Sequence, residues 1–152
     1  MWYLVLAAVL VAADQAVKFI IQSHFAVQQS VPVIEGIFHL TYIQNTGAAF
    51  SILEGQKLLF ILITSVVSLL ILGYVIKNRR SGSRWLLLPL TSVAAGGIGN
   101  LIDRIRLGYV VDYLDFRVFA IFNIADMAVT IGCAFLVIYF FGIEPKIKKK
   151  NL

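Results

Sequence analysis

Residues 58–80 read LLFILITSVVSLLILGYVIKNRR, an apolar run with no charged residue from Leu58 to Ile76 that ends in a basic cluster. A helix of about 20 mostly apolar residues is long enough to cross the hydrocarbon core of a bilayer. Lys and Arg are enriched where such a helix emerges into the cytoplasm. This stretch therefore predicts a transmembrane helix over residues 58–76 whose C-terminal end is cytoplasmic.

Three other segments have the same apolar character, at residues 2–21, 85–105 and 122–143. The first also resembles a cleavable signal peptide, because residues 11–13 (VAA) look like a small-residue cleavage site. It has no basic residue before the apolar run, however, and apolar residues continue to Ile21, so a permanent span is favoured.

Composition supports four spans. Hydrophobic residues make up 60% of the chain and charged residues only 14%, whereas a soluble domain carries about 25% charged residues. A surface that faces water could not accommodate this apolar excess. We predict an all-α membrane protein with four transmembrane helices, folded as a single domain over residues 1–152.

The basic residues set the orientation. Two clusters adjoin the ends of spans, one with Lys77, Arg79, Arg80 and Arg84 and the other with Lys146, Lys148, Lys149 and Lys150. Both belong in the cytoplasm, whereas residues 22–56 contain no Lys or Arg and belong outside. Both termini are therefore predicted inside. Contact of these clusters with anionic lipid headgroups explains the net charge of +5 without a nucleic-acid partner.

The first outer connection has the composition of short strands. Residues 32–52 mix β-branched and aromatic residues with Gly36 and Gly47, and residues 38–43 alternate loosely between polar and apolar. Strands at a membrane surface need their backbone groups paired or in water. We predict a small β-rich extracytoplasmic element between the first and second helices.

Polar residues inside the spans gather at one level. Ionisable residues within membrane helices are rare and are usually functional. The predicted orientation places most of them near the outer ends of their spans, namely Asp14, Lys18, Asn100, Asp103, Arg104, Asn123 and Asp126. Three further polar residues lie in the outer connections: Asn45, Asp112 and Asp115. The inner half of the bundle is left almost entirely apolar.

Some of these residues also have structural explanations. Asp14 and Lys18 are spaced i and i+4, which permits an ion pair on one helix face. Residues 123–126 fit a variant of the capping box at a helix start. Ala95 and Gly99 have the small-x-x-x-small spacing that lets membrane helices pack closely.

The chemistry available at this level is that of carboxylates. The sequence places no Ser–His or Cys–His pair there, and it lacks the His and Cys ligands that a zinc site needs. Two acids held close together cannot both ionise cheaply, so one keeps a proton while the other activates water, with no metal or cofactor. Asp126, one turn into a span, is one candidate. Its partner could be Asp112, Asp115, Asp103 or Asp14.

Five blocks of sequence carry a resemblance to a known family. In chain order they are residues 14–18 (DQAVK), 45–51 (NTGAAFS), 96–104 (GGIGNLIDR), 108–113 (GYVVDY) and 122–126 (FNIAD). Together they resemble the bacterial lipoprotein signal peptidases (signal peptidase II), which are intramembrane aspartic proteases. The layout of four spans with both termini inside is also similar to that family.

The resemblance implies that Asp112 and Asp126 form the catalytic dyad, and it selects Asp112 over Asp115. It also implies a set of residues that bind substrate or support the site: Asn45, Gly47, Asn100, Arg104, Asn123, Asp14 and Lys18. It implies no metal and no cofactor.

The substrate implied by the resemblance is a prolipoprotein whose cysteine carries a diacylglyceryl group, cut just before that cysteine. The enzyme would be a multi-pass protein of the bacterial cytoplasmic (inner) membrane, with its active site near the extracytoplasmic leaflet. Its partners would be lipid-modified prolipoproteins and membrane lipids, and we expect it to act as a monomer.

A small ion-coupled membrane transporter or channel subunit is the alternative from another class, because it too would need buried acids. Transporters place their coupling groups near the bilayer midplane, often on broken helices. Here the charges gather at one face of the membrane, which favours the peptidase.

Overall fold

The computed structural model describes residues 2–47 and 57–145. Its elements in chain order are α1 (Trp2–His24), β1 (Ser30–Ile34), β2 (Phe38–Asn45), α2 (Lys57–Asn78), α3 (Arg84–Arg106), β3 (Val110–Asp115), α4 (Ile124–Ile138) and the π-helix η2 (Tyr139–Ile143). Three features discussed above lie outside the described residues: the last part of the 45–51 block, the end of the predicted 32–52 element, and the lysines of the C-terminal tail.

Within the described ranges, four helices of 23, 21, 23 and 20 residues are long and apolar enough to cross a membrane, the last formed by α4 and η2 together. The predicted fold class of four apolar helices with a small β element is confirmed. The last helix begins at Ile124, two residues later than the start of its predicted span, because Asn123 has an extended backbone and caps the helix instead.

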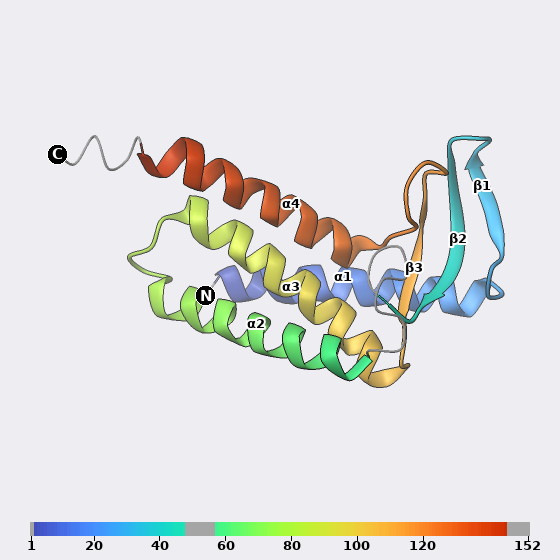
Figure 1. The fold of residues 1–152 in the computed structure, drawn as a ribbon, viewed down its shortest axis with the longest axis horizontal. Coiled ribbons are helices and arrows are strands. Elements are labelled where there is room, and N and C mark those ends of the chain that lie inside the picture. The colour runs from blue at the N-terminus through green and yellow to red at the C-terminus, as the bar shows by residue number, and fades with distance from the viewer. Residues whose placement is uncertain (1, 48–56, 146–152) are drawn as a thin grey trace.

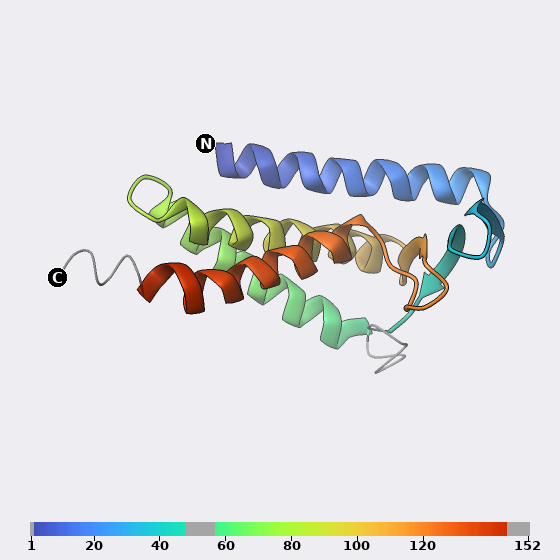
Figure 2. The ribbon, with the colours of Figure 1, turned by 90° about the horizontal axis from the view of Figure 1, so that it is seen from above.

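Helix α3 is the centre of the bundle. Helices α1, α2 and α4 each pack against it (Figures 1 and 2). Its glycines allow these contacts: a Cβ on Gly96 would overlap the carbonyl oxygen of Ala125 in α4, and one on Gly97 would lie 2.9 Å from Oγ of Ser68 in α2. A Cβ on Gly99 would lie 2.6 Å from a carboxylate oxygen of Asp14 in α1. Three glycines thus let three helices approach α3 closely.

The sheet is antiparallel, with strand order β1-β2-β3. Strand β2 pairs with β1 through Thr41 and Ser30, and with β3 through Asn45 and Val110. The third strand comes from the connection between α3 and α4, where the sequence analysis predicted no strand. Pro32 lies in β1, at the edge of the sheet, where a missing N–H is tolerated.

A buried cluster joins the sheet to the end of α1. It contains Ile21 of α1, Tyr42 of β2, and Val111 and Tyr113 of β3. These side chains are nearly inaccessible and hold β3 against α1. Because Val111 and Tyr113 flank Asp112, their packing fixes the position of Asp112.

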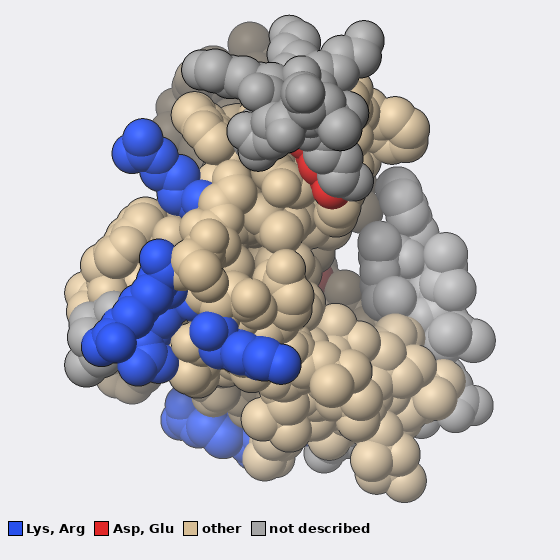
Figure 3. Space-filling model, turned by 90° about the vertical axis from the view of Figure 1, so that its left-hand side faces the viewer, with Lys and Arg blue, Asp and Glu red and all other residues tan. Residues whose placement is uncertain are grey.

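The two ends of the bundle differ in character. The sheet lies at one end, and at the other lie the start of α1, the α2–α3 turn and the end of η2 (Figure 1). Lys and Arg side chains gather on this second end (Figure 3), where the end of α2, the α2–α3 turn and the start of α3 carry Lys77, Arg79, Arg80 and Arg84. The bundle is therefore basic at the end away from the sheet.

Candidate active site

The start of α4 positions Asp126 through a reciprocal cap. Oδ1 of Asn123 accepts a hydrogen bond from the backbone N–H of Asp126 at 2.9 Å. Oδ2 of Asp126 accepts one from the backbone N–H of Asn123 at 3.2 Å. This is the capping box predicted from the spacing, and it holds the carboxylate at the electropositive end of the helix.

The same Asn123 side chain also holds Asp112. Its Nδ2 donates to Oδ1 of Asp112 at 2.7 Å. A backbone N–H can only donate, so Oδ1 of Asn123 must face Asp126 and its amide nitrogen must face Asp112. Asn123 therefore contacts both carboxylates, that of Asp112 through its side-chain amide and that of Asp126 through its backbone N–H.

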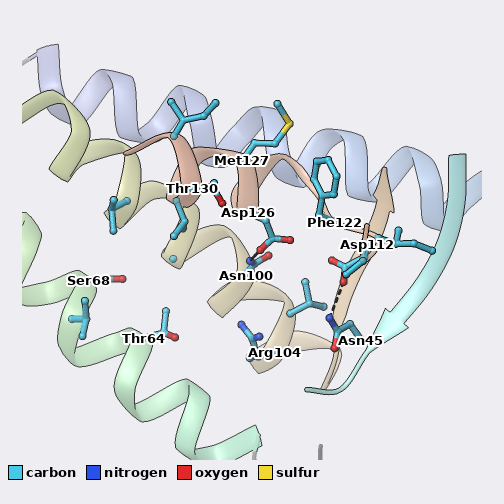
Figure 4. Close-up of a pocket in the computed structure, with 18 of the residues that line it drawn as sticks. Asn45, Thr64, Ser68, Asn100, Arg104, Asp112, Phe122, Asp126, Met127 and Thr130 are labelled. Atoms are coloured by element: carbon cyan, nitrogen blue, oxygen red, sulfur yellow. Dashed lines mark hydrogen bonds between the residues drawn. The ribbon is translucent and has the colours of Figure 1, made fainter. Parts of the chain in front are cut away.

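Strand β3 brings Asp112 to this point, and β2 supplies a second donor. Nδ2 of Asn45 donates to Oδ2 of Asp112 at 2.9 Å (Figure 4). The orientation of this amide is also fixed, because Oδ1 of Asn45 accepts the backbone N–H of Gly47 at 2.9 Å. Asp112 thus receives two amide N–H groups and is only 2% exposed.

Asp112 has an unusual acidity for an aspartate. Burial, followed by the nearby charge of Asp126, raises the pKa of Asp112 to about 7. The hydrogen bonds from Asn45 and Asn123 and the positive charge of Lys18 act in the opposite direction. Near neutral pH this carboxyl group can therefore hold or release a proton.

Asn100 of α3 supplies the donor to Asp126. Its Nδ2 lies 2.7 Å from Oδ1 of Asp126. Its Oδ1 accepts hydrogen bonds from the Lys18 ammonium at 2.8 Å and from Nδ2 of Asn123 at 3.1 Å. Both carboxylates are thus surrounded by amide donors whose orientations are fixed by groups that can only donate.

Behind the carboxylates lies a buried charged cluster. The Lys18 ammonium lies 2.9 Å from Asp14 and 2.9 Å from Asp103, and none of the three side chains is more than 3% exposed. Nε2 of Gln15 donates to Oδ1 of Asp103 at 2.9 Å. The ion pair expected from the spacing of Asp14 and Lys18 is therefore present, with Asp103 as a second acid.

The two acids of this cluster also bind the backbone of neighbouring elements. Oδ1 of Asp14 accepts the N–H of Ala125 in the first turn of α4 at 3.0 Å. Oδ2 of Asp103 accepts the N–H of Val111 in β3 at 3.1 Å. Asp14 and Asp103 therefore anchor the two segments that carry Asp126 and Asp112.

Asp115 lies further along β3 with different partners. Its carboxylate accepts hydrogen bonds from Oγ1 of Thr41 at 2.8 Å, and from the backbone and guanidinium of Arg117 at 2.9 and 3.1 Å. Burial raises its pKa, but these hydrogen bonds outweigh burial, and the pKa of Asp115 lies below its usual value. Asp112 and Asp126 are thus linked through Asn123, whereas Asp115 bonds to Thr41 of the neighbouring strand and to Arg117.

The carboxylates open onto a cavity of about 780 Å³ between α2, α3, α4 and β3. One end of it is polar (Figure 4), lined by Asn45, Asn100, Arg104, Asp112 and Asp126. Nη2 of Arg104 donates to the carbonyl oxygen of Gly47 at 3.2 Å, and its guanidinium lies 5.0 Å from the ring centre of Phe60. Much of the remaining wall is apolar side chains of α2, α3 and α4. Within the described ranges, no cluster of His, Cys, Asp or Glu could hold a metal ion.

Residues 6–142 match the family model described as signal peptidase (SPase) II. The chain belongs to the signal peptidase II family. It is 50% identical over 135 residues to the lipoprotein signal peptidase of Halothermothrix orenii, an alignment that covers 89% of this chain and 92% of that relative. It is 47% identical over 145 residues to the lipoprotein signal peptidase of Syntrophus aciditrophicus, covering 90% and 89% of the two chains.

A solved structure of a bacterial membrane enzyme, obtained by the in meso method at 2.3 Å resolution, is also similar. It matches with a TM-score of 0.84 and 32% sequence identity over 91% of this chain and 86% of that one. The predicted family is confirmed, and with it the class of aspartic endopeptidase in a bacterial multi-pass membrane protein. The transporter or channel alternative is not supported.

The signal peptidase II resemblance named nine site residues, and the structure brings them together at one end of the bundle. Five line the polar end of the cavity. The other four lie behind or beside it and hold those five in place: Asp14, Lys18, Gly47 and Asn123. Gln15 was missed as a site residue, although it lies within the 14–18 block whose residues carried the resemblance.

Proposed function

We propose that this signal peptidase II family member removes signal peptides from diacylglyceryl-modified prolipoproteins, cutting just before the lipidated cysteine. The observation that carries the proposal is the pair of carboxylates, Asp112 and Asp126, joined by Asn123 at the polar end of a cavity that is otherwise largely apolar. A lipidated peptide needs an apolar cavity for its chains and a polar centre for its scissile bond. The lipoprotein signal peptidases to which the chain is similar support the same substrate class.

The proposed chemistry uses Asp112 and Asp126 as a pair that shares one proton. The pKa of Asp112, raised to about 7, supports this sharing near neutral pH. The ionised carboxylate takes a proton from water, whose oxygen attacks the scissile carbonyl carbon, while the protonated carboxyl group donates to the carbonyl oxygen. The tetrahedral intermediate then releases the amine, which leaves with a proton from the pair as the C–N bond breaks.

Each amide donor has a defined task in this proposal. Asn45 and Asn123 hold Asp112, and Asn100 holds Asp126, each through N–H groups that cannot exchange places with an oxygen. Arg104 contributes positive charge at the polar end of the cavity, where it interacts with both carboxylates. Positioned groups of this kind stabilise charge in the transition state without reorganising during the reaction.

The proposed orientation has both termini in the cytoplasm. The basic end of the bundle lies opposite the sheet (Figures 1 and 3), as the positive-inside rule requires of a cytoplasmic end. The dyad then lies near the extracytoplasmic leaflet of the cytoplasmic (inner) membrane. One chain supplies all nine site residues, and helices α1, α2 and α4 each pack against α3. We therefore also propose a single peptidase domain that acts as a monomer.

The test is cleavage of a purified diacylglyceryl-modified prolipoprotein by the purified protein in detergent, with EDTA present. Wild type is compared with Asp126→Asn and Asp112→Asn, which keep the shape of each carboxylate but cannot act as a base. We expect cleavage by wild type and loss of cleavage in both variants, while thermal unfolding shows that the variants are folded. Normal cleavage by either variant would remove that residue from the dyad, and no cleavage by folded wild type would reject the function.

A further inference from the structure

A set of hydroxyl groups lines the cavity one helical turn beyond the carboxylates, toward the basic end. Thr130 follows Asp126 by four residues in α4, a rise of about 6 Å. On the opposite wall, Oγ of Ser68 lies against Gly97, which precedes Asn100 by one turn of α3. Thr64, one turn from Ser68 on the same face of α2, also lines the cavity (Figure 4). These three residues are named the hydroxyl tier.

The hydroxyl tier has no hydrogen-bond partner within the described part of the chain. In α3, by contrast, two hydroxyl groups bond back to the carbonyl four residues earlier, Thr91 to Leu87 at 2.7 Å and Ser92 to Leu88 at 3.3 Å. Ser68 makes no such bond, although it is only 5% exposed. Its hydroxyl group points into the cavity instead (Figure 4).

An unpaired hydroxyl group in an apolar wall costs free energy unless a ligand supplies its partner. The surrounding wall identifies the kind of partner. Beside the tier the cavity is lined by Val67, Ile71 and Val129, so an ionised group would lose its hydration with no opposite charge to compensate. A neutral acceptor, such as a carbonyl oxygen, fits donors in this setting.

We propose that the hydroxyl tier is a donor subsite for a carbonyl oxygen of the lipidated substrate, an inference that rests on the proposed function. Two carbonyls of such a substrate fall within reach when the scissile bond lies at the carboxylates. An extended peptide advances about 3.3 Å per residue, so a backbone carbonyl two residues into the signal peptide reaches the tier. The ester carbonyls of the diacylglyceryl group lie only a few bonds from the cysteine sulfur and reach the same level.

The experiment measures binding, so that it does not depend on cleavage. The chain carrying Asp126→Asn is titrated with two diacylglyceryl-modified signal peptides that differ in one respect. One has ester-linked chains and the other has ether-linked chains, which lack the carbonyl oxygens. The titrations are repeated with Ser68→Ala or Thr130→Val introduced into the Asp126→Asn chain. Each of these changes removes a hydroxyl group and leaves the helix intact.

Loss of a neutral hydrogen bond corresponds to an increase in Kd of about threefold to tenfold. An increase for the ester peptide alone assigns the tier to the lipid esters. An equal increase for both peptides assigns it to the signal-peptide backbone. Unchanged Kd values for both peptides overturn the proposal, including the case in which the hydroxyl groups only hold water.

The matched control is Ser92→Ala, which removes a hydroxyl group that already bonds back within α3 and does not line the cavity. We expect it to leave both Kd values unchanged. The proposed function is tested separately by cleavage with the wild-type chain. A chain that binds the peptides through the tier but does not cleave them would reject the peptidase mechanism and retain the subsite.

Discussion

The ammonium of Lys18 lies 2.8 Å from Oδ1 of Asn100, and this contact determines which way the Asn100 amide faces. A lysine can only donate, so the amide oxygen must point to Lys18 and the amide nitrogen to Asp126, 2.7 Å away. Lys18 thus acts on the site without touching either carboxylate of the pair. The charge of a buried lysine fixes the polarity of a neutral side chain beside the proposed dyad.

Replacing Asn100 with Asp should therefore reduce cleavage, although the two side chains have nearly the same size and shape. The Lys18 contact can be kept, because a carboxylate oxygen also accepts from lysine, but the other oxygen then faces Asp126 with no proton to donate. We expect kcat/KM to fall by about tenfold to a hundredfold, the loss of one hydrogen bond to a charged group. Cleavage assays on the purified variant measure this directly.

Asn78→Asp is the matched control for this change. Asn78 is the last residue of α2, donates to the carbonyl oxygen of Tyr74 and does not line the cavity. We expect cleavage by this variant to equal that of wild type. Equal rates for Asn100→Asp and Asn78→Asp would show that the donor to Asp126 has no part in the reaction.

The pH dependence of cleavage should follow the proton held by Asp112. With its pKa at about 7, the proton shared by the pair is lost as pH rises through that value. We expect kcat/KM, which reports on the free enzyme, to decline steadily from about pH 7 upward, tenfold for each unit at high pH. A rate that stays level from pH 6 to pH 9 would contradict a shared proton on this group.

The pH dependence of stability should carry the same signature. The folded-state pKa of Asp112 is about 7 against an ordinary 3.8, so between these values the folded protein binds the proton more tightly than the unfolded chain. The stability that the Asp112 proton contributes is fully present below pH 3.8, the ordinary pKa. It is lost as pH rises through about 7, the folded-state pKa. Asp112→Asn removes the effect and should raise Tm relative to wild type more at pH 8 than at pH 5.

Asp115→Asn provides the opposite case on the same strand. The pKa of Asp115 is lowered, so the stability it contributes is present above its ordinary value and lost only as pH falls through the lower, folded value. Its removal should therefore change Tm by the same amount at pH 5 and pH 8. We also expect substantial cleavage to remain, and complete loss would reopen the choice between Asp112 and Asp115.

The sequence predicted the helices and the gathering of polar residues at one end of the bundle, because both depend on simple patterns. Span length and the position of Lys and Arg were enough to place Asp14, Asn100 and Asp126 together. Strand β3 was not predicted, because its residues are buried on both faces except for a partly exposed Leu114, so no alternation of polar and apolar residues marks it. Without that strand the residues alone could not select Asp112 as the proposed partner of Asp126.

The amide network was also beyond sequence reasoning. The orientation of Asn45 depends on the N–H of Gly47, and that of Asn100 depends on Lys18 from another helix. Contacts in the folded protein decide these orientations, such as that between Lys18 and Asn100, which lie far apart in the sequence. The spacing of residues along the chain does not predict such contacts. Resemblance to the family named the asparagines as site residues, but it did not give the direction in which each one donates.

The contact between Gly96 and α4 yields the last prediction. A Cβ at Gly96 would overlap the carbonyl oxygen of Ala125 and come within 2.8 Å of the Val129 side chain. Gly96→Ala should therefore push α4 away from α3, with a loss of about 1–3 kcal/mol typical of overpacking. The same shift would lengthen the bond between Asn100 and Asp126, so cleavage should fall together with Tm.

Gly73→Ala in α2 separates this steric effect from the general effect of replacing a helical glycine. A Cβ there meets no described atom within 4 Å, and alanine favours a helix over glycine by up to about 1 kcal/mol. We expect its Tm to equal or exceed that of wild type, with cleavage unchanged. If Gly96→Ala matched Gly73→Ala in Tm and in cleavage, the close approach of α3 and α4 would not be what holds Asp126 against Asn100.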